Sequence, residues 1–401
     1  MKIGDFSYNV LFIFIFKDFI WKLVRLLPPP PISIPIVVAF DNNYCIPAGV
    51  SLYSMLSSCA QERDGVKLFY QIHCLVDSLS AENIEKLKRT IAPFSAFSGI
   101  EFCDISKNDA YPFKLVSQLF LRINPFAKKR FSKMILCRLL LASIFSQYEK
   151  IIMFDVDTLF VGDISESFFI PMDGAYFGMV KEDLSLFGLD SLDKFLKNRI
   201  DCIRYFELDE ESILPTEELI TLYRNHFNVG FMIANLKLWR DDNLEEKLCE
   251  FFVARNHSLI CPEQDTINIV CVNKILPISD SYNFSHRLFY RKKINEKSDV
   301  CMVHFFSHEK PWNHSYFHLP YATKWHETLF KTFFAWDFFE NYKNQFENYK
   351  NQFENYKNQI ENLGNNKRNF FEFLNTRLNK KTLIQYILFK IFKKLESFCL
   401  R

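Results

Sequence analysis

Apolar and polar positions alternate along the chain in blocks typical of strands followed by helices. Short apolar runs, too short for helices, predict buried strands at Ile36–Phe40, Leu68–Val76, Ile100–Ile105 and Ile151–Phe154. Segments with a helix-like period or composition predict helices at Pro47–Cys59, Ser80–Arg89 and Lys133–Phe145. Strands that alternate with helices favour an α/β domain with a mostly parallel sheet, which we assign to residues 32–335.

The N-terminal segment, residues 1–31, is apolar but interrupted by charge. Tyr8–Leu27 carries four charged side chains between positions 17 and 25, so Val10–Phe16 is its only uninterrupted apolar run. A transmembrane helix needs about twenty apolar residues. A signal peptide carries its charges before the apolar run and a small-residue cleavage site after it. We therefore favour an interfacial helix over both alternatives, and Pro28–Pro31 ends it.

Residues 336–363 contain an internal repeat with a period of seven. The sequence FENYKNQ occurs three times between Phe339 and Gln359, with Phe and Tyr at the a and d positions of a heptad. This seam predicts a coiled coil. Because isolated helices this short are marginal unless their apolar face is buried, we expect pairing into a homodimer. A solvated linker helix is the alternative.

Residues 364–401 predict a basic amphipathic helix. The segment after Gly364 carries nine Lys and Arg residues against two Glu, and its apolar residues from Ile384 to Phe398 recur at intervals of three and four. Such a helix suits an anionic membrane surface. Docking of the same apolar stripe onto the α/β domain is the alternative.

Composition narrows the class of protein. The net charge of +2 over 401 residues gives no nucleic-acid signature, so no nucleic-acid partner is expected. The 45 phenylalanines require a large core or apolar partner surfaces. The 11 cysteines have no paired spacing, which indicates a reducing cytoplasm rather than a disulfide scaffold.

The predicted strand Ile151–Phe154 ends in Asp155 and Asp157. Alternate residues of an extended chain project to the same side, and ligands of α/β sheets collect at the carboxyl ends of strands. Two carboxylates there suit Mn²⁺, or Mg²⁺, with a substrate phosphate completing the coordination. A solvated junction between strand and loop is the commoner reading of an isolated Asp-x-Asp, but three further segments favour the metal.

The first of these segments, Val37–Tyr44, ends in Asp41 and two asparagines, which could bind a uracil edge or a ribose hydroxyl but are also ordinary turn residues. The second, Cys301–Trp312, contains His304 and Lys310. An imidazole is an acceptable Mn²⁺ ligand beside carboxylates, and lysine suits a phosphate. A lone histidine would more often be a core residue.

The third is a pair of segments with amides or acids beside apolar runs. Asn228, Glu263 and Gln264 could read sugar hydroxyls. A strand-end turn explains Asn228 equally well. A helix N-terminus, where acidic residues complement the dipole, explains Glu263.

With these motifs in view, the chain resembles glycosyltransferase family 8, the retaining sugar-nucleotide enzymes that include glycogenin and bacterial lipopolysaccharide galactosyl- and glucosyltransferases. The resemblance covers about Ile34–Trp312, with AFDNNY, RLLL, FDVDTLFVGDI, FNVGFMIANLKLW, EQD and HFFSHEKPW in the family's order. It implies an α/β fold of GT-A type, a Rossmann-like nucleotide-diphospho-sugar transferase domain, here with a C-terminal helical extension. The chain departs from the family pattern at Ser307, where Gly is common, and at Glu263, where Asp is more usual.

The resemblance also implies the roles of individual residues. The implied metal ligands are Asp155, Asp157 and His304. Ala39, Asp41, Asn43 and Tyr44 would frame the nucleotide, Arg138 would reach the donor sugar or phosphate, Asn228, Glu263 and Gln264 would hold the donor sugar, and Lys310 would bind the pyrophosphate. We take Gln264, Asp155 and Arg138 as the catalytic candidates. Retention by double displacement needs a nucleophile, and Gln264 is a poor one, so we favour same-face attack.

The expected activity is Mn²⁺-dependent transfer of galactose or glucose from a UDP-hexose. The expected acceptor is lipopolysaccharide or lipooligosaccharide, a lipid-linked glycan, at the inner face of the cytoplasmic membrane, where the protein is peripheral. A protein or another glycan is an alternative acceptor. A metal-dependent nucleotidyltransferase or phosphatase is an alternative enzyme class, which release of UDP from UDP-sugars would exclude. A membrane scaffold without activity leaves the ordered motifs unexplained.

Overall fold

The computed structural model describes residues 29–205, 213–292, 299–313, 316 and 318–341, with the single positions 343, 347 and 351. The predicted interfacial helix, most of the heptad repeat and the basic tail lie outside these residues. The chain divides into two compact units, Met1–Phe333 and Phe334–Arg401, and the α/β fold belongs to the first. Among the described residues, no helix is both long and apolar enough to cross a membrane.

Within the described residues, the main sheet has eight strands. Their spatial order is β2-β3-β1-β5-β8-β7-β9, and β4 pairs with β3. The bounds are β1 Ile32–Asp41, β2 Glu62–Arg63, β3 Val66–Asp77, β4 Ser98–Asp104, β5 Lys150–Phe154, β7 Phe177–Lys181, β8 Phe227–Asn235 and β9 Ile275–Pro277. The smaller sheet, in the order β10-β11-β6, consists of β6 Thr158–Phe160, β10 Phe284–Ser285 and β11 Met302–His304.

The main sheet is mixed: six of its eight strands point the same way, as the prediction of a mostly parallel sheet requires, and only β8 and the short β2 run in the opposite direction. β4, β3, β1 and β5 lie parallel to one another, whereas β8 is antiparallel to both β5 and β7. The apolar pattern could not reveal this reversal, because β8 is buried along nearly its whole length. A strand covered on both faces has the same apolar pattern in either direction.

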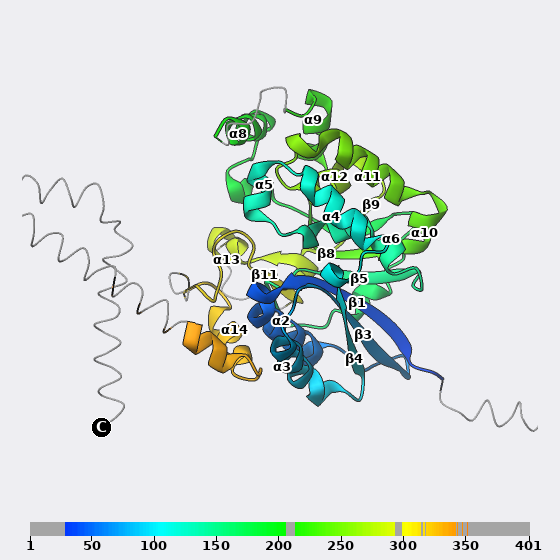
Figure 1. Cartoon of the computed structure of the whole chain (residues 1–401), viewed down its shortest axis with the longest axis vertical. Helices are drawn as coiled ribbons and strands as arrows, with labels where there is room; N and C mark the ends of the chain where they lie inside the picture. The colour runs from blue at the N-terminus through cyan, green and yellow to red at the C-terminus, as the bar shows by residue number, and fades with distance from the viewer. Residues whose placement is uncertain are drawn as a thin grey trace, which may run out of the picture. The chain divides into compact units, whose positions relative to one another are not determined.

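Helices cover both faces of the main sheet. They are α2 Cys45–Ser58, α3 Ala81–Ile91, α4 Phe113–Arg122, α5 Pro125–Arg130, α6 Leu141–Ile144, α7 Ser165–Phe168, α8 Leu192–Tyr205, α9 Thr216–Arg224, α10 Leu236–Asp241, α11 Leu244–Arg255, α12 Pro262–Val270, α13 His286–Lys292 and α14 Ala322–Leu329. In Figure 1, α2, α3 and α14 lie on one side of the strands, and α4, α10, α11 and α12 lie on the other. The α/β prediction is therefore confirmed as a layered fold.

The helix predicted over Lys133–Phe145 is wrong in its geometry. Lys133–Leu139 form a 3-10 helix, and α6 follows as a single short turn. The seven residues 136–142 are all buried in succession. A segment without an exposed face takes its conformation from the surrounding packing, because local periodicity then gives no preference for 3.6 residues per turn.

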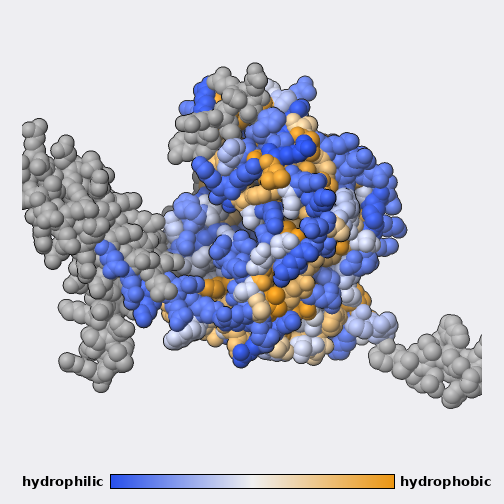
Figure 2. All heavy atoms as spheres, in the orientation of Figure 1, coloured by the Kyte–Doolittle hydropathy of each residue, from blue (hydrophilic) through white to orange (hydrophobic). Residues whose placement is uncertain are grey.

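Aromatic side chains account for much of the core. The rings of Phe154 and Phe160 meet edge to face at 4.8 Å, and those of Phe177 and Trp239 at 4.9 Å. All four are fully or almost fully buried. The face seen in Figure 2 is a mosaic of hydrophilic residues with smaller hydrophobic patches. Among the described residues, no two cysteines form a disulfide.

Candidate active site

Asp155 and Asp157 lie in the turn between β5 and β6. The backbone N–H of Asp155 donates to the carbonyl of Gly230 at 2.9 Å. The Thr158 hydroxyl donates to the Asp155 carbonyl at 2.8 Å. Val156 between the two aspartates is buried, so its neighbours face the opposite way. The turn therefore presents both carboxylates on one side, as the i, i+2 spacing predicts.

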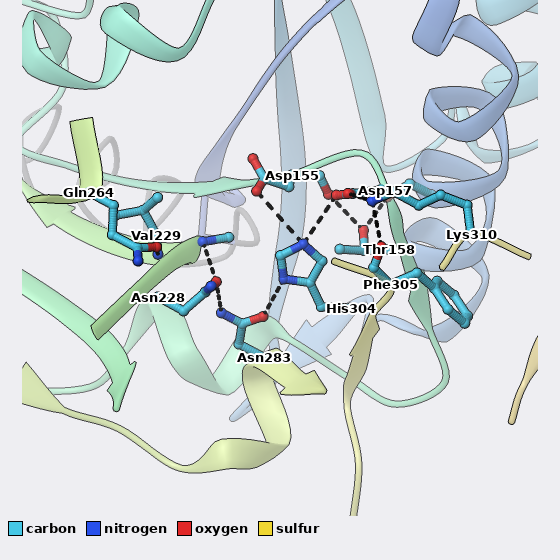
Figure 3. Close-up of polar contacts among 12 residues, drawn as sticks. Asp155, Asp157, Thr158, Asn228, Val229, Gln264, Asn283, His304, Phe305 and Lys310 are labelled. Carbon is cyan, nitrogen blue, oxygen red and sulfur yellow. Dashed lines mark hydrogen bonds and ion pairs between the residues drawn. The ribbon is translucent and has the colours of Figure 1, made fainter. Parts of the chain in front are cut away.

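The smaller sheet brings His304 to these carboxylates. His304 pairs with Thr158 across antiparallel β11 and β6. Its Nε2 lies 3.2 Å from Oδ1 of Asp157 and 3.8 Å from Oδ2 of Asp155 (Figure 3). One ligand atom from each of the three residues lies within 4.8 Å of the others. Two carboxylate oxygens and an imidazole nitrogen suit a divalent ion such as Mn²⁺, so these side chains fit the predicted metal.

Two buried cations compensate the carboxylates. The Lys310 ammonium donates to Oδ2 of Asp157 and to the Phe305 carbonyl. The Arg138 guanidinium donates to Oδ1 of Asp155. Burial raises the pKa of Asp157, but Lys310 and His304 outweigh it and hold that pKa well below its usual range. Asp157 is therefore ionised at neutral pH, as a metal ligand must be.

Glu263, near the start of α12, is a buried carboxyl with an unpaired oxygen. Its Oε1 lies 3.9 Å from Nη1 of Arg138, an ion-pair distance too long for a hydrogen bond. Its Oε2 is buried and has no hydrogen-bond partner within the described residues. Burial raises the pKa of Glu263 to about 7, although Arg138 opposes the shift. A buried acceptor without a partner is a ready place for a ligand hydroxyl.

Asp265 anchors α12 and thereby positions Glu263 and Gln264. Its two oxygens accept hydrogen bonds from the Arg199 guanidinium at 2.8 and 2.9 Å. One of them also accepts from the backbone N–H of Ile260 at 3.0 Å. Burial raises the pKa of Asp265, but Arg199 outweighs it and keeps that pKa below its usual value. Breaking a buried pair of this kind costs about 3–5 kcal/mol, so α12 is firmly held by α8.

The amide oxygens of Gln264 and Asn228 are both engaged by β8. Oε1 of Gln264 accepts from the backbone N–H of Val229 at 3.3 Å. Oδ1 of Asn228 accepts from the backbone N–H of Gly230 at 2.8 Å. Figure 3 shows these groups around His304. Both amides lie near the carboxylates, but their oxygens are committed to protein donors.

The residues that end β1 form a turn, which is the alternative reading of Asp-Asn-Asn. Oδ1 of Asp41 accepts from the backbone N–H of Asn43 at 2.9 Å and caps a short 3-10 helix, Asn42–Tyr44. Ala39 is half-buried in β1, and Asn43 is exposed. None of the hydrogen bonds or ion pairs of the described residues joins Asp41 or Asn43 to the carboxylates of the metal triad.

Tyr44 links this turn to the metal triad electrostatically. Burial, together with the charges of Asp157, Asp155 and Asp41, raises the pKa of Tyr44 to about 12. Tyr44 as a residue remains 39% exposed, and its ring meets that of Trp312 edge to face at 6.3 Å. Tyr44 therefore presents a neutral, partly open aromatic surface beside the carboxylates.

Two residues that sequence reasoning missed lie at the centre of this cluster. A Cβ at Gly230 would lie 2.5 Å from Nδ1 of His304 and 2.8 Å from Oδ1 of Asn228, so no side chain fits there. The sequence did contain a signal for Gly230, because an isolated Gly within a strand often marks a place where another group approaches the backbone closely. Oδ1 of Asn283 lies 2.9 Å from Nδ1 of His304. No sequence motif pointed to Asn283.

Ser307 has a φ of 72°, in the left-handed region where the family pattern has Gly. That conformation costs a residue with a side chain about 1–2 kcal/mol. The Arg287 guanidinium donates to the Ser307 hydroxyl at 3.4 Å, and to Glu309 at 2.9 Å. The loop before Lys310 thus keeps the glycine-like turn, held by side-chain contacts.

Known proteins are similar to this chain over the stretch that contains the site residues. The model of the family described as Glycosyl transferase family 8 matches residues 35–315. General stress protein A of Bacillus subtilis is 25% identical over 312 residues, which cover 72% of this chain and 94% of the relative. A lipopolysaccharide 1,2-glucosyltransferase of Escherichia coli is 23% identical over 288 residues, covering 68% of this chain and 71% of the relative.

Solved structures share the fold. The apo structure of the bifunctional glycosyltransferase WbbM has a TM-score of 0.57 at 18% identity, covering 79% of this chain and 52% of that protein. The galactosyltransferase LgtC, solved with donor and acceptor sugar analogues, has a TM-score of 0.53 at 16% identity, covering 75% of this chain and 96% of that protein. At these identities the likeness concerns the fold alone, and it confirms the predicted GT-A type.

The raised pKa of Glu263 predicts how stability depends on pH. The folded pKa, about 7, exceeds the ordinary value of 4.5, so the folded protein binds this proton more tightly than the unfolded chain. Its contribution to the free energy of unfolding is then full below pH 4.5 and is lost as pH rises towards 7. Glu263→Gln removes the titration. In denaturant titrations of metal-free protein, wild-type stability relative to Glu263→Gln should fall across this window, and a flat or rising difference would contradict the burial argument.

Proposed function

The chain belongs to glycosyltransferase family 8, and on that premise we propose that it transfers galactose or glucose from a UDP-sugar with retention of configuration. The observation that carries the proposal is the convergence of Asp155, Asp157 and His304 on one point, beside the buried unpaired oxygen of Glu263. A metal triad next to a buried acceptor fits a ligand with a diphosphate at one end and hydroxyls at the other.

The metal end of the donor is served by residues from three elements. Asp155, Asp157 and His304 would hold Mn²⁺, which would supply the positive charge that neutralises a departing diphosphate. Lys310 lies against Asp157, where its ammonium can turn to the pyrophosphate as a point charge. Mg²⁺ suits the two carboxylates, but the imidazole favours Mn²⁺.

The sugar end is served by the start of α12. Glu263 accepts a sugar hydroxyl at its unpaired Oε2. Arg138 lies between Asp155 and Glu263, where it can reach the donor sugar or phosphate. Asn228 and Gln264 lie near the same region and would contribute to the binding of the donor sugar. Ala39, Asp41, Asn43 and Tyr44 frame the nucleotide, with the Tyr44 ring as its aromatic surface.

The surroundings of α12 favour same-face attack over double displacement. Double displacement requires a nucleophile at the reacting carbon. The oxygen of Gln264 is bound to Val229, and Asp265 is locked in its pair with Arg199. Glu263, with its pKa near 7, is only partly ionised at neutral pH. In same-face attack, the acceptor hydroxyl would form its bond to the anomeric carbon as the bond from that carbon to the diphosphate oxygen breaks, and the departing diphosphate, beside Lys310, would accept the hydroxyl proton on that face.

The acceptor we propose is a lipopolysaccharide or lipooligosaccharide core at the inner face of the cytoplasmic membrane. Two observations support it: a relative named as a lipopolysaccharide 1,2-glucosyltransferase, and the basic amphipathic sequence of residues 364–401. That tail lies outside the described residues, as do most of the heptads that we propose pair two copies.

Loss of one metal ligand should nearly abolish turnover. Asp157→Asn removes a charge where the diphosphate is neutralised, and we expect UDP release from UDP-galactose or UDP-glucose with Mn²⁺ to fall about 100-fold or more. Asp193→Asn, an exposed carboxylate in α8, is the matched control and should be unaffected. Full activity of wild type in excess EDTA, or phosphate rather than UDP as the product, would reject the proposal.

Removal of the tail should release the protein from membranes. A chain ending at Leu363 should move from the membrane to the supernatant on fractionation, while hydrolysis of free UDP-sugar persists. Replacing Ile387, Leu388 and Ile391 by Ser keeps every charge and should release the protein partly, because the apolar stripe supplies the insertion. If the truncated chain stays fully membrane-bound, the tail is not the anchor and Tyr8–Leu27 takes that role.

The heptads should set the oligomeric state without affecting chemistry. Replacing Phe346, Tyr349 and Phe353 by Ser removes three seam residues, and light scattering should then report monomers that retain turnover on a soluble acceptor. Asn348→Ser with Asn351→Ser alters outward heptad positions and should leave a dimer. A monomeric unmutated protein would refute the pairing.

A further inference from the structure

The imidazole of His304 is held from behind by Asn283. Nδ1 of His304 lies 2.9 Å from Oδ1 of Asn283, while Nε2 faces Asp155 and Asp157 (Figure 3). His304 is 2% exposed and Asn283 is 7% exposed, so water does not compete for this contact. Asn283 comes from the short 3-10 helix Asp280–Asn283 that precedes β10.

A backbone group fixes the direction of this hydrogen bond. The N–H of Gly230 can only donate, so the atom of Asn228 that lies 2.8 Å from it must be the amide oxygen. The same oxygen receives a second hydrogen bond, from Nδ2 of Asn283 at 2.8 Å. The other side-chain atom of Asn283 is then its oxygen, which requires Nδ1 of His304 to donate.

The other end of Asn228 agrees with this direction. Its Nδ2 donates to Oε1 of Glu182 at 3.3 Å, and a carboxylate can only accept. Amide and imidazole orientations are ambiguous in isolation. Here the series of hydrogen bonds through Asn228 and Asn283 starts at a group that can only donate, the N–H of Gly230. A second branch ends at a group that can only accept, the carboxylate of Glu182. Each amide therefore has a single consistent orientation.

We propose that Asn283 is a positioning residue that keeps the proton of His304 on Nδ1 and its lone pair on Nε2, aimed at the metal. A neutral imidazole with hydrogen on Nδ1 can ligate only through Nε2. That is the nitrogen 3.2 Å from Oδ1 of Asp157. The inference rests on the proposed metal site and assigns to it a residue outside the family motifs.

The imidazole of His304 is packed from two directions. The Phe306 ring meets the imidazole at 5.3 Å, close to perpendicular. On another side, the absent side chain of Gly230 makes the room that the imidazole fills. Because the ring is packed on both sides, loss of the Asn283 oxygen leaves a buried N–H without a partner, or favours the tautomer with hydrogen on Nε2.

The test measures metal binding rather than turnover. Free Mn²⁺ is followed by electron paramagnetic resonance during titration of the full-length protein in the presence of UDP. Asn283→Leu removes the acceptor at similar volume, and its Mn²⁺ dissociation constant should rise 10–100-fold, the usual cost of losing a partner of a ligating histidine. Asn283→Asp keeps an oxygen for Nδ1 and should recover most of the affinity.

Asn124→Leu is the matched control. Asn124 is also a buried amide, bonded to the Leu259 carbonyl at 2.9 Å and to the Ala127 N–H at 2.8 Å. It should lower the melting temperature without changing Mn²⁺ affinity. If Asn283→Leu does not fold, Asn283→Ser takes its place, because the serine side chain is too short for its hydroxyl oxygen to reach Nδ1 of His304.

An Mn²⁺ dissociation constant within twofold of wild type in the folded Asn283 variant would overturn the inference. An equal loss in Asn124→Leu would overturn it as well, because the effect would then be general destabilisation. Wild type that binds no Mn²⁺ with UDP would overturn the metal site itself, and with it this role. The first two outcomes leave the proposed function standing.

Discussion

Two like charges in one short turn are the constraint on which the rest of the structure depends. Asp155 and Asp157 project to the same side of the turn after β5, and burial disfavours the charged form of Asp157. The protein meets this with Arg138 against Asp155, and with Lys310 and His304 against Asp157. Removing one member of a buried pair of this kind costs about 3–5 kcal/mol. The compensating groups are therefore part of the fold as well as of the site.

That compensation explains why distant segments meet here. Arg138 precedes β5, whereas His304 and Lys310 arrive some 150 residues later through the antiparallel pairing of β11 with β6. β8 closes the third side, because only Gly230 lets the imidazole approach. The cations that neutralise the carboxylates also lie where a diphosphate and a sugar would bind. Charge in the region thus stays balanced with or without metal and donor.

The sequence predicted the local parts of this arrangement well. The i, i+2 aspartates follow directly from strand geometry, and the order of motifs led to the GT-A type fold, which the solved structures share. What it could not supply depends on tertiary packing. The reversal of β8 leaves no trace in a run buried on both faces. The 3-10 geometry around Arg138 arises where every side chain is buried. Asn283 acts only through a neighbour brought to it by the fold.

The central claim is that Asp155, Asp157 and the Nε2 atom of His304 bind one divalent ion beside the nucleotide. Anomalous diffraction at the manganese edge, from crystals soaked with Mn²⁺ and UDP, tests it most directly. The account predicts a single strong peak about 2.2 Å from one oxygen of each aspartate and from Nε2 of His304. A peak too far from Nε2 of His304 for a metal–ligand bond would contradict the claim. The absence of a peak between the aspartates when UDP is bound would also contradict it.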